Sequence, residues 1–86
     1  MGDALVIFRL YPEDIEDVEK IEAGLKELKV GQVREVRREP IAFGLELVKV
    51  AIVIPDKVEG MMEKLEEAVK KIPGVKEVET AGITLV

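Results

Sequence analysis

A short turn-like segment carries the residue best suited to binding another molecule. Pro40, Ile41, Ala42, Phe43 and Gly44 (PIAFG) separate two stretches that are rich in strand-forming residues. An aromatic side chain between small residues in a turn has few core neighbours, and two interpretations are open. Phe43 either folds back over one end of the domain or is presented as an apolar anchor of the kind that dominates protein interfaces.

The only basic cluster consists of Arg34, Arg37 and Arg38. Charged residues on an edge strand prevent one sheet from pairing with another, which is the first interpretation of this cluster. The second is that the three arginines dock on an acidic protein surface. Met61 and Met62 are interpreted as core-filling residues of a helix.

The residue types that the sequence lacks exclude most catalytic chemistry. The 86 residues include no Cys, His or Ser, and the only Thr residues are Thr80 and Thr84. Thiolate metal sites, His general bases and Ser–His nucleophiles therefore cannot be assembled. The glycines form neither GxGxxG nor GxxxxGK[ST], so we expect this chain to bind no nucleotide itself. We predict no catalytic residue, no cofactor and no metal.

The charge balance disfavours nucleic acid and membrane as partners. Thirteen basic and 18 acidic residues give a net charge of −5, whereas nucleic-acid binders usually carry a basic surface. No apolar run is long enough to cross a bilayer and no signal peptide precedes the first predicted strand, so we expect a cytoplasmic protein. Asn is absent and Gln32 is the only Gln, a composition typical of proteins from thermophiles.

Hydrophobic periodicity predicts four strands and two helices. Strand formers dominate residues 3–11, 45–54 and 75–86, while residues 32–39 form a polar strand whose apolar residues, Val33 and Val36, have opposite parity. That parity predicts a bulge or an exposed edge. The first helix is expected to begin at Pro12 and the second at Pro55, with Asp56 as its N-cap. The expected apolar stripes are Ile15, Val18, Ile21, Leu25 and Leu28 in the first helix, and Val58, Met61, Met62, Leu65, Ala68, Val69 and Ile72 in the second.

The order strand, helix, strand, strand, helix, strand predicts an α+β fold, a ferredoxin-like βαββαβ sandwich in which a four-stranded antiparallel sheet carries two helices on one face. Residues 1–86 are expected to form one domain. Val6 and Phe8 belong to the sheet face that meets the helices, while Leu5 and Ile7 belong to the open face. The open face is still rich in apolar residues, which suggests that a partner or the chain termini cover part of it.

The segment Glu39 to Asp56 (EPIAFGLELVKVAIVIPD) resembles archaeal elongation factor 1-beta and the C-terminal guanine-exchange domain of the eukaryotic factor. The resemblance covers essentially the whole chain, and its most specific part is Ile41, Ala42, Phe43 and Gly44. It implies a guanine nucleotide exchange factor, not an enzyme, that promotes GDP release and GTP reloading on elongation factor 1-alpha during translation elongation. It also implies that Phe43 is an interface anchor on that GTPase.

The C-terminal residues Thr84, Leu85 and Val86 are the second expected contact with the GTPase. The resemblance implies a penultimate Lys that reaches toward the Mg²⁺ of the GTPase in eukaryotic members, but Leu85 occupies that position here. Displacement of Mg²⁺ would therefore come from insertion of the C-terminal strand or from remodelling of the phosphate-loop and switch backbone of the GTPase.

Two functions of other classes are compatible with the same fold. One is a ferredoxin-like regulatory module that binds a small molecule, and the other is a ribosome-associated protein. The acidic balance of the chain disfavours the second.

Overall fold

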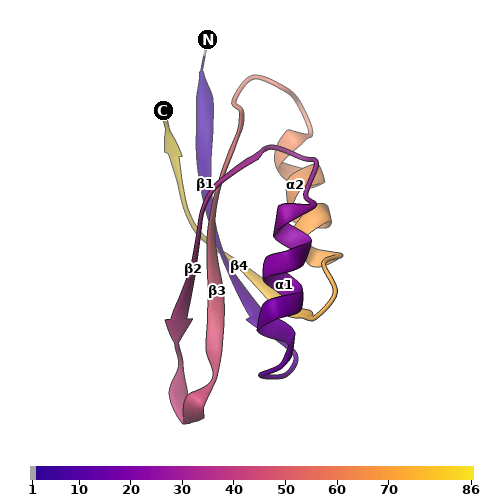
Figure 1. Cartoon of the computed structure of the whole chain (residues 1–86). Coiled ribbons are helices and arrows are strands. Elements are labelled where there is room, and N and C mark those ends of the chain that lie inside the picture. Colours follow the sequence, from indigo (N-terminus) through magenta and orange to yellow (C-terminus); the bar gives the residue numbers. More distant parts are fainter. Residues whose placement is uncertain (1) are drawn as a thin grey trace.

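Four antiparallel strands form one sheet, and both helices lie on the same face of it, as Figure 1 shows. The computed structural model describes residues 2–86. The strands are β1 (Asp3–Pro12), β2 (Gln32–Pro40), β3 (Glu46–Pro55) and β4 (Val75–Leu85), in the spatial order β2-β3-β1-β4. The helices are α1 (Asp17–Lys26) and α2 (Met61–Lys70), and a short 3-10 turn, η1 (Ala42–Gly44), joins β2 to β3. The predicted βαββαβ sandwich is confirmed, with residues 46–55 as a central strand.

Alternate residues of the two central strands form the core. In β1, Val6, Phe8 and Leu10 are completely buried, while the residues between them lie on the open face. Burying a side chain of this size contributes roughly 1.5–3 kcal/mol, so the alternation fixes the register of both strands. The core consists of Ala4, Val6, Phe8, Leu10, Val18, Ile21, Leu25, Val48, Val50, Ile52, Ile54, Leu65, Val69 and Ile72.

The first helix begins later than the sequence predicted. Pro12 still pairs with Val75, and the amide of Glu13 donates to the carbonyl of Gly74 at 2.9 Å, so sheet pairing occupies the expected first turn. Residues 13–16 form a turn, and α1 begins at Asp17. Ile15 therefore lies outside the helix with 56% of its surface exposed, and its place in the apolar stripe was wrong.

The prediction that the second helix begins at Pro55 was also wrong, and for the same reason. Pro55 pairs with Asp3, and the amide of Asp56 donates to the carbonyl of Gly2 at 3.0 Å, so these residues extend the sheet. The helix begins at Met61 after Gly60, whose φ of 75° lies in the left-handed region. Asp56 is not the N-cap, and Val58 is exposed.

The polar strand β2 is both an edge strand and bulged. The register shifts between Val33, which pairs with Ile52, and Glu35, which pairs with Ala51, so Arg34 is the extra residue. The bulge explains how Val33 and Val36 come to lie on the same face of the sheet. Both alternatives that the sequence left open are therefore present.

The domain is elongated, with principal extents of 43 × 20 × 17 Å. Figure 1 shows the β2–β3 hairpin at one end of the long axis and both chain termini at the other. Within residues 2–86, no helix is long and apolar enough to span a bilayer.

Candidate partner-binding site

The turn between β2 and β3 has a defined backbone geometry. The amide of Ile41 donates to the carbonyl of Leu45 at 2.7 Å, and the amide of Leu45 donates to the carbonyl of Ala42 at 3.3 Å. These bonds close a tight turn in which Phe43 has φ 62° and ψ 34° and Gly44 has φ 74°. Phe43 is the one non-glycine residue with positive φ among residues 2–86. Two consecutive left-handed residues reverse the chain and turn the side chain of Phe43 outward.

Phe43 has almost no contact with the rest of the protein. Its relative exposure is 97%, and Ile41 and Leu45 beside it are also exposed. The interpretation that Phe43 folds back over one end of the sandwich was therefore wrong. An aromatic residue in the left-handed region costs free energy that no packing recovers here, and uncompensated strain of this kind is concentrated at functional sites. We call Ile41 to Leu45 the hairpin tip.

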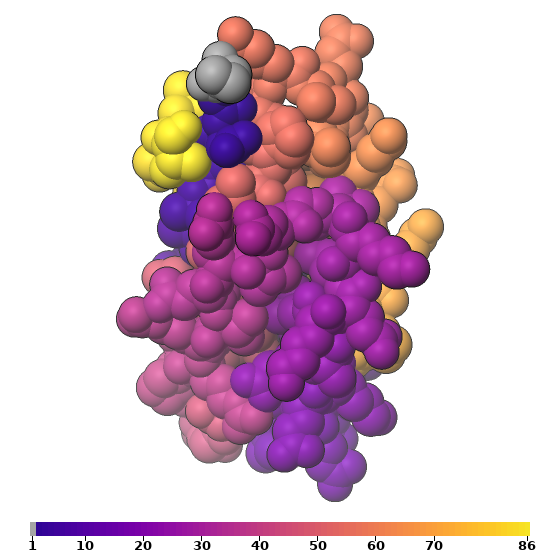
Figure 2. Space-filling model, turned by 45° about the horizontal axis from the view of Figure 1, so that its top comes forward, coloured from indigo at the N-terminus to yellow at the C-terminus, as the bar shows by residue number. Residues whose placement is uncertain are grey.

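The C-terminal residues form the second candidate contact. Thr84 pairs with Leu5 in β4, and Val86 exchanges two backbone hydrogen bonds with Asp3, of 2.9 and 3.5 Å. Leu85 and Val86 are nonetheless exposed, because β4 is an edge strand. Figure 2 shows these residues in yellow at the outer edge of the domain, beside the start of the chain. The backbone of this segment is therefore fixed in the sheet, while its apolar side chains are exposed, Leu85 on the helix-bearing face and Val86 on the open face.

Sequence reasoning missed one exposed apolar residue at this end. Ile83 lies on the helix-bearing face of β4, opposite Val6, but 57% of its surface is exposed. The cause is the late start of α2 at Met61, which leaves this part of β4 without a helix above it. The alternation of the strand predicts which face Ile83 occupies. A helix beginning at Pro55, as the sequence predicted, would have buried its side chain.

The structure does not bring the two candidate contacts together. The hairpin tip (Ile41 to Leu45) and residues 84–86 lie at opposite ends of the 43 Å long axis, as Figure 1 shows. No single small-molecule pocket can include both. A surface that contacts both has to run along the whole domain.

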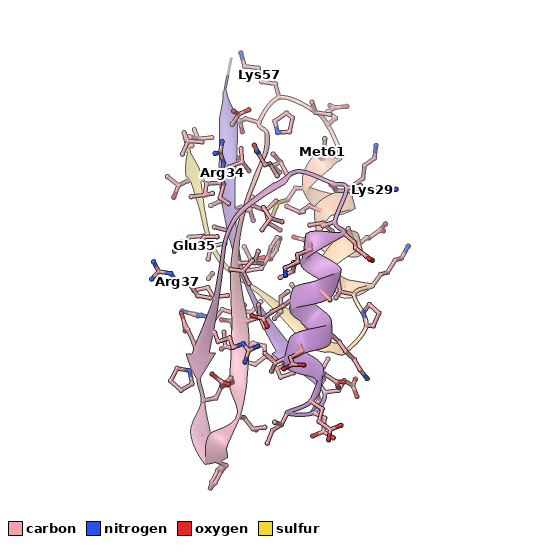
Figure 3. The ribbon with its side chains drawn as sticks, viewed as in Figure 1. Lys29, Arg34, Glu35, Arg37, Lys57 and Met61 are labelled. Carbon is pink, nitrogen blue, oxygen red and sulfur yellow. The ribbon has the colours of Figure 1, made fainter. Side chains whose placement is uncertain are left out.

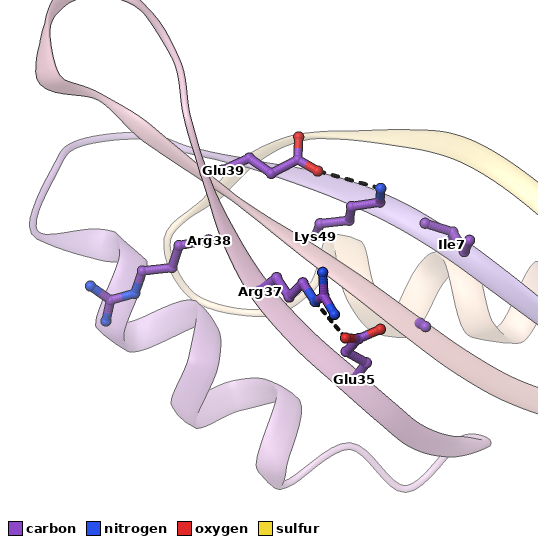
Figure 4. Close-up of a pocket in the computed structure, with 7 residues that line it drawn as sticks. Ile7, Glu35, Arg37, Arg38, Glu39 and Lys49 are labelled. Carbon is purple, nitrogen blue, oxygen red and sulfur yellow. Dashed lines mark hydrogen bonds and ion pairs between the residues drawn. The ribbon is translucent and has the colours of Figure 1, made fainter.

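Charged residues cover the open face next to the hairpin. Arg37 pairs with Glu35, and Lys49 pairs with Glu39 at 3.4 Å, on either side of a shallow hollow of about 290 Å³, as Figure 4 shows. Arg37 and Glu35 project away from the helices in Figure 3. Each of these two cations has its own carboxylate, so this hollow has no free positive charge for an anion. In residues 2–86, His, Cys, Asp and Glu form no group of three or more that could hold a metal ion.

The three arginines of the basic cluster are not used alike. Arg34 is the bulged residue of β2, Arg37 faces the open side, and Arg38 reaches across to α1. Nε of Arg38 donates to Glu22 at 3.1 Å, and this hydrogen bond lowers the pKa of the Glu22 carboxyl, although burial acts in the opposite direction. Arg38 therefore connects the edge strand to the helix layer, and the three arginines do not form one continuous patch for docking, which was the second interpretation of this cluster.

The fold is shared with proteins of unrelated sequence. The solved structure of the ACT domain from GTP pyrophosphokinase of Chlorobium tepidum has a TM-score of 0.62 and 18% sequence identity, and the alignment covers 91% of this chain and 97% of that one. At this level of identity the likeness concerns the fold alone.

Two relatives are similar over nearly their entire length. Elongation factor 1-beta of Methanospirillum hungatei is 44% identical over 87 residues and all of both chains, and elongation factor 1-beta of Ignicoccus hospitalis is 40% identical over 82 residues, 92% of this chain and 87% of that one. Residues 5–86 also match the family described as the EF-1 guanine nucleotide exchange domain. This chain therefore belongs to the elongation factor 1 guanine nucleotide exchange domain family, whose members are exchange factors and not enzymes.

Proposed function

We propose that this chain binds elongation factor 1-alpha and accelerates release of GDP from it, so that GTP can reload. Residues 1–86 act as one exchange domain in the cytoplasm, without nucleotide, cofactor or metal of their own. Family membership supports exchange over the small-molecule module and the ribosome-associated protein. The structural observation that carries the proposal is Phe43, an aromatic side chain held outward at the hairpin tip with no packing role.

The proposed mechanism requires no covalent chemistry. If the exchange domain binds the nucleotide-free GTPase more tightly than the GDP-bound form, linkage weakens GDP binding by the same factor. A thousandfold acceleration of release corresponds to about 4 kcal/mol of barrier lowering. A few apolar anchors can supply it, because a single interface hot spot contributes about 2 kcal/mol or more. The free energy comes from contacts that exist only when GDP has left.

Two regions make these contacts in our proposal. The first is the hairpin tip, in which Ile41, Ala42, Phe43 and Gly44 provide the anchor. The second is the C-terminal end of β4, residues 84–86. Their positions at opposite ends of the domain support a GTPase interface that follows the long axis and reaches two separate parts of the GTPase.

The second region would act without a cation. Leu85 and Val86 are apolar, so they cannot replace the charge of Mg²⁺. The hydrogen bonds between Val86 and Asp3 hold the strand end in the sheet, which supports a steric wedge. A wedge of this kind would displace the switch or phosphate-loop backbone of the GTPase, and Mg²⁺ would lose its ligands indirectly.

The test compares two quantities on the same GTPase. Release of fluorescent GDP from elongation factor 1-alpha is followed with and without this chain, and the affinity of the chain is measured for the nucleotide-free and GDP-bound forms. We expect faster release and tighter binding to the nucleotide-free form. Equal affinity for both forms would refute the proposal, because no exchange can then be driven by binding.

A further inference from the structure

The two edges of the sheet are protected very differently. The edge strand β2 carries five charged residues among nine, namely Arg34, Glu35, Arg37, Arg38 and Glu39, and it is bulged. The other edge strand, β4, is also bulged, at Ala81, but it has charges only in its first half, and residues 80–86 (TAGITLV) have none. Charged side chains are a usual means by which an edge strand avoids pairing with another chain. We call residues 80–86 the uncharged edge.

The register shows which backbone groups of the uncharged edge are free. Val86 and Asp3 form a hydrogen-bonded pair, and hydrogen-bonded pairs recur at every second residue of an antiparallel ladder. Thr84 with Leu5 and Gly82 with Ile7 are therefore the next such pairs. It follows that Ile83 and Leu85 direct their N–H and C=O groups away from β1, toward the outer side of the sheet.

An apolar groove lies beside these groups on the helix-bearing face. It has a volume of about 210 Å³ and runs from Ile83 across β1 to the start of α2. Met61, labelled at the beginning of α2 in Figure 3, is partly buried against the core. The apolar side chains lining the groove include Ala4, Val6, Ile54, Met61, Met62 and Ile83.

We propose that the uncharged edge receives an extended segment of the GTPase as an additional β-strand. The inference rests on the proposed function. In such strand addition, main-chain hydrogen bonds to the edge provide affinity, and alternate side chains of the added strand fill pockets on one face. The outward N–H and C=O groups of Ile83 and Leu85 provide the main-chain hydrogen bonds. The groove provides the pockets for the alternate side chains. The added segment has aliphatic side chains at alternate positions, because the groove is lined mainly by apolar residues and the edge carries no charge; the one charged lining residue is Asp56.

A second copy of this chain fits the edge less well. Seven residues of strand are about 23 Å long, so pairing buries roughly 250 Å² on each partner, whereas a stable interface needs about 800 Å² per partner. Two copies, each with a net charge of −5, also repel each other. The GTPase contributes the remaining area through the hairpin tip, and the uncharged edge includes residues 84–86 of the proposed interface.

The first measurement is amide hydrogen exchange in the free chain and in its complex with nucleotide-free elongation factor 1-alpha. The amides of Ile83 and Leu85, which face outward, are expected to gain protection in the complex. The amide of Thr84, which is already bonded to Leu5, serves as the internal control and is expected to be protected in both states.

The second measurement compares Leu85→Pro with Leu85→Ala. Both variants remove the exposed side chain, but only proline removes the outward N–H, and proline is tolerated where an edge N–H faces solvent. We expect Leu85→Pro to bind the nucleotide-free GTPase about fivefold more weakly than Leu85→Ala, the effect of one hydrogen bond. Circular dichroism verifies that both variants fold. If one of them does not fold, the hydrogen-exchange measurement on the unmodified chain still tests the proposal.

The outcomes separate this inference from the proposed function. If the unmodified chain accelerates GDP release but Ile83 and Leu85 gain no protection and the two variants bind equally, strand addition is refuted and the exchange function stands. If the unmodified chain neither binds the GTPase nor accelerates release, the proposed function fails and the inference with it. A concentration-dependent dimer in sedimentation, with protection of Ile83 in the free chain, would overturn the GTPase as the occupant.

Discussion

Replacing Phe43 by Gly separates the stability of this domain from its binding. Phe43 has a φ of 62°, and the left-handed conformation costs an L-residue roughly 1–2 kcal/mol. Glycine adopts it freely but loses about 0.5–1 kcal/mol more to chain entropy on folding. Because the Phe43 side chain is almost completely exposed, its removal forfeits almost no buried area. We therefore expect Phe43→Gly to leave the free energy of unfolding unchanged or to raise it by up to about 1.5 kcal/mol.

The same substitution should impair exchange strongly. An aromatic anchor at the centre of a contact contributes about 2 kcal/mol. Its loss should therefore lower the rate of GDP release in the presence of this chain by roughly thirtyfold. Release of fluorescent GDP from elongation factor 1-alpha measures this effect, and urea unfolding of the same protein measures stability. Phe43→Ala keeps the backbone strain, so it should lose exchange to the same extent without gaining stability.

The matched control is Val36→Ala, which truncates another exposed apolar residue in the middle of β2, away from the hairpin tip and from residues 84–86. It should leave the exchange rate within about twofold, because surface truncations outside an interface have little effect on binding. A normal exchange rate in Phe43→Gly would remove Phe43 from the mechanism. A loss of more than about 1 kcal/mol of stability would show that Phe43 has a packing role after all.

Three further predictions concern the rest of the domain. Gly24→Ala should destabilise the fold by about 1–3 kcal/mol in urea unfolding, because the new Cβ would lie 2.5 Å from Cγ2 of Ile72, and this outweighs the better helix propensity of Ala. The hydrogen bond from Arg38 lowers the pKa of Glu22, so its contribution to stability is present at neutral pH and is lost as the pH falls below the ordinary value of 4.5; in Arg38→Ala, unfolding curves should show a smaller loss over that range. Deleting residues 85–86 should impair GDP release more than binding, and an equal loss of both would indicate simple docking.

The fold could be predicted from the sequence because its strongest signals are local and periodic. The alternation in residues 45–54 and the parity conflict between Val33 and Val36 each gave the correct structure. The predicted start of the second helix was wrong because Pro55 and Asp56 look locally like the first turn of a helix. In the structure Pro55 instead lies opposite Asp3 in the sheet, and the amide of Asp56 donates to the carbonyl of Gly2. A strand partner more than fifty residues away in the sequence leaves no signal in a window of ten.

The candidate site could be predicted only as separate pieces. The residue types identified Phe43 as a candidate anchor, but the choice between a folded-back and an outward ring depended on its left-handed backbone, which phenylalanine rarely adopts. Ile83 was missed because its exposure follows from where α2 begins. The distance between the hairpin tip and residues 84–86 is a property of strand order and length, and no motif encodes it.

That distance bears directly on how exchange can occur without a cation at position 85. β1 and β3 pair without interruption from Asp3 to Leu10, so the two proposed contacts are held apart by a continuous ladder along the long axis. A stiff body of fixed length binds tightly only to a GTPase whose two contact regions have the matching separation. If loss of GDP creates that separation, the binding free energy at both ends selects the nucleotide-free form. A flexible linker between the same two contacts would bind both forms alike, and it would release no GDP.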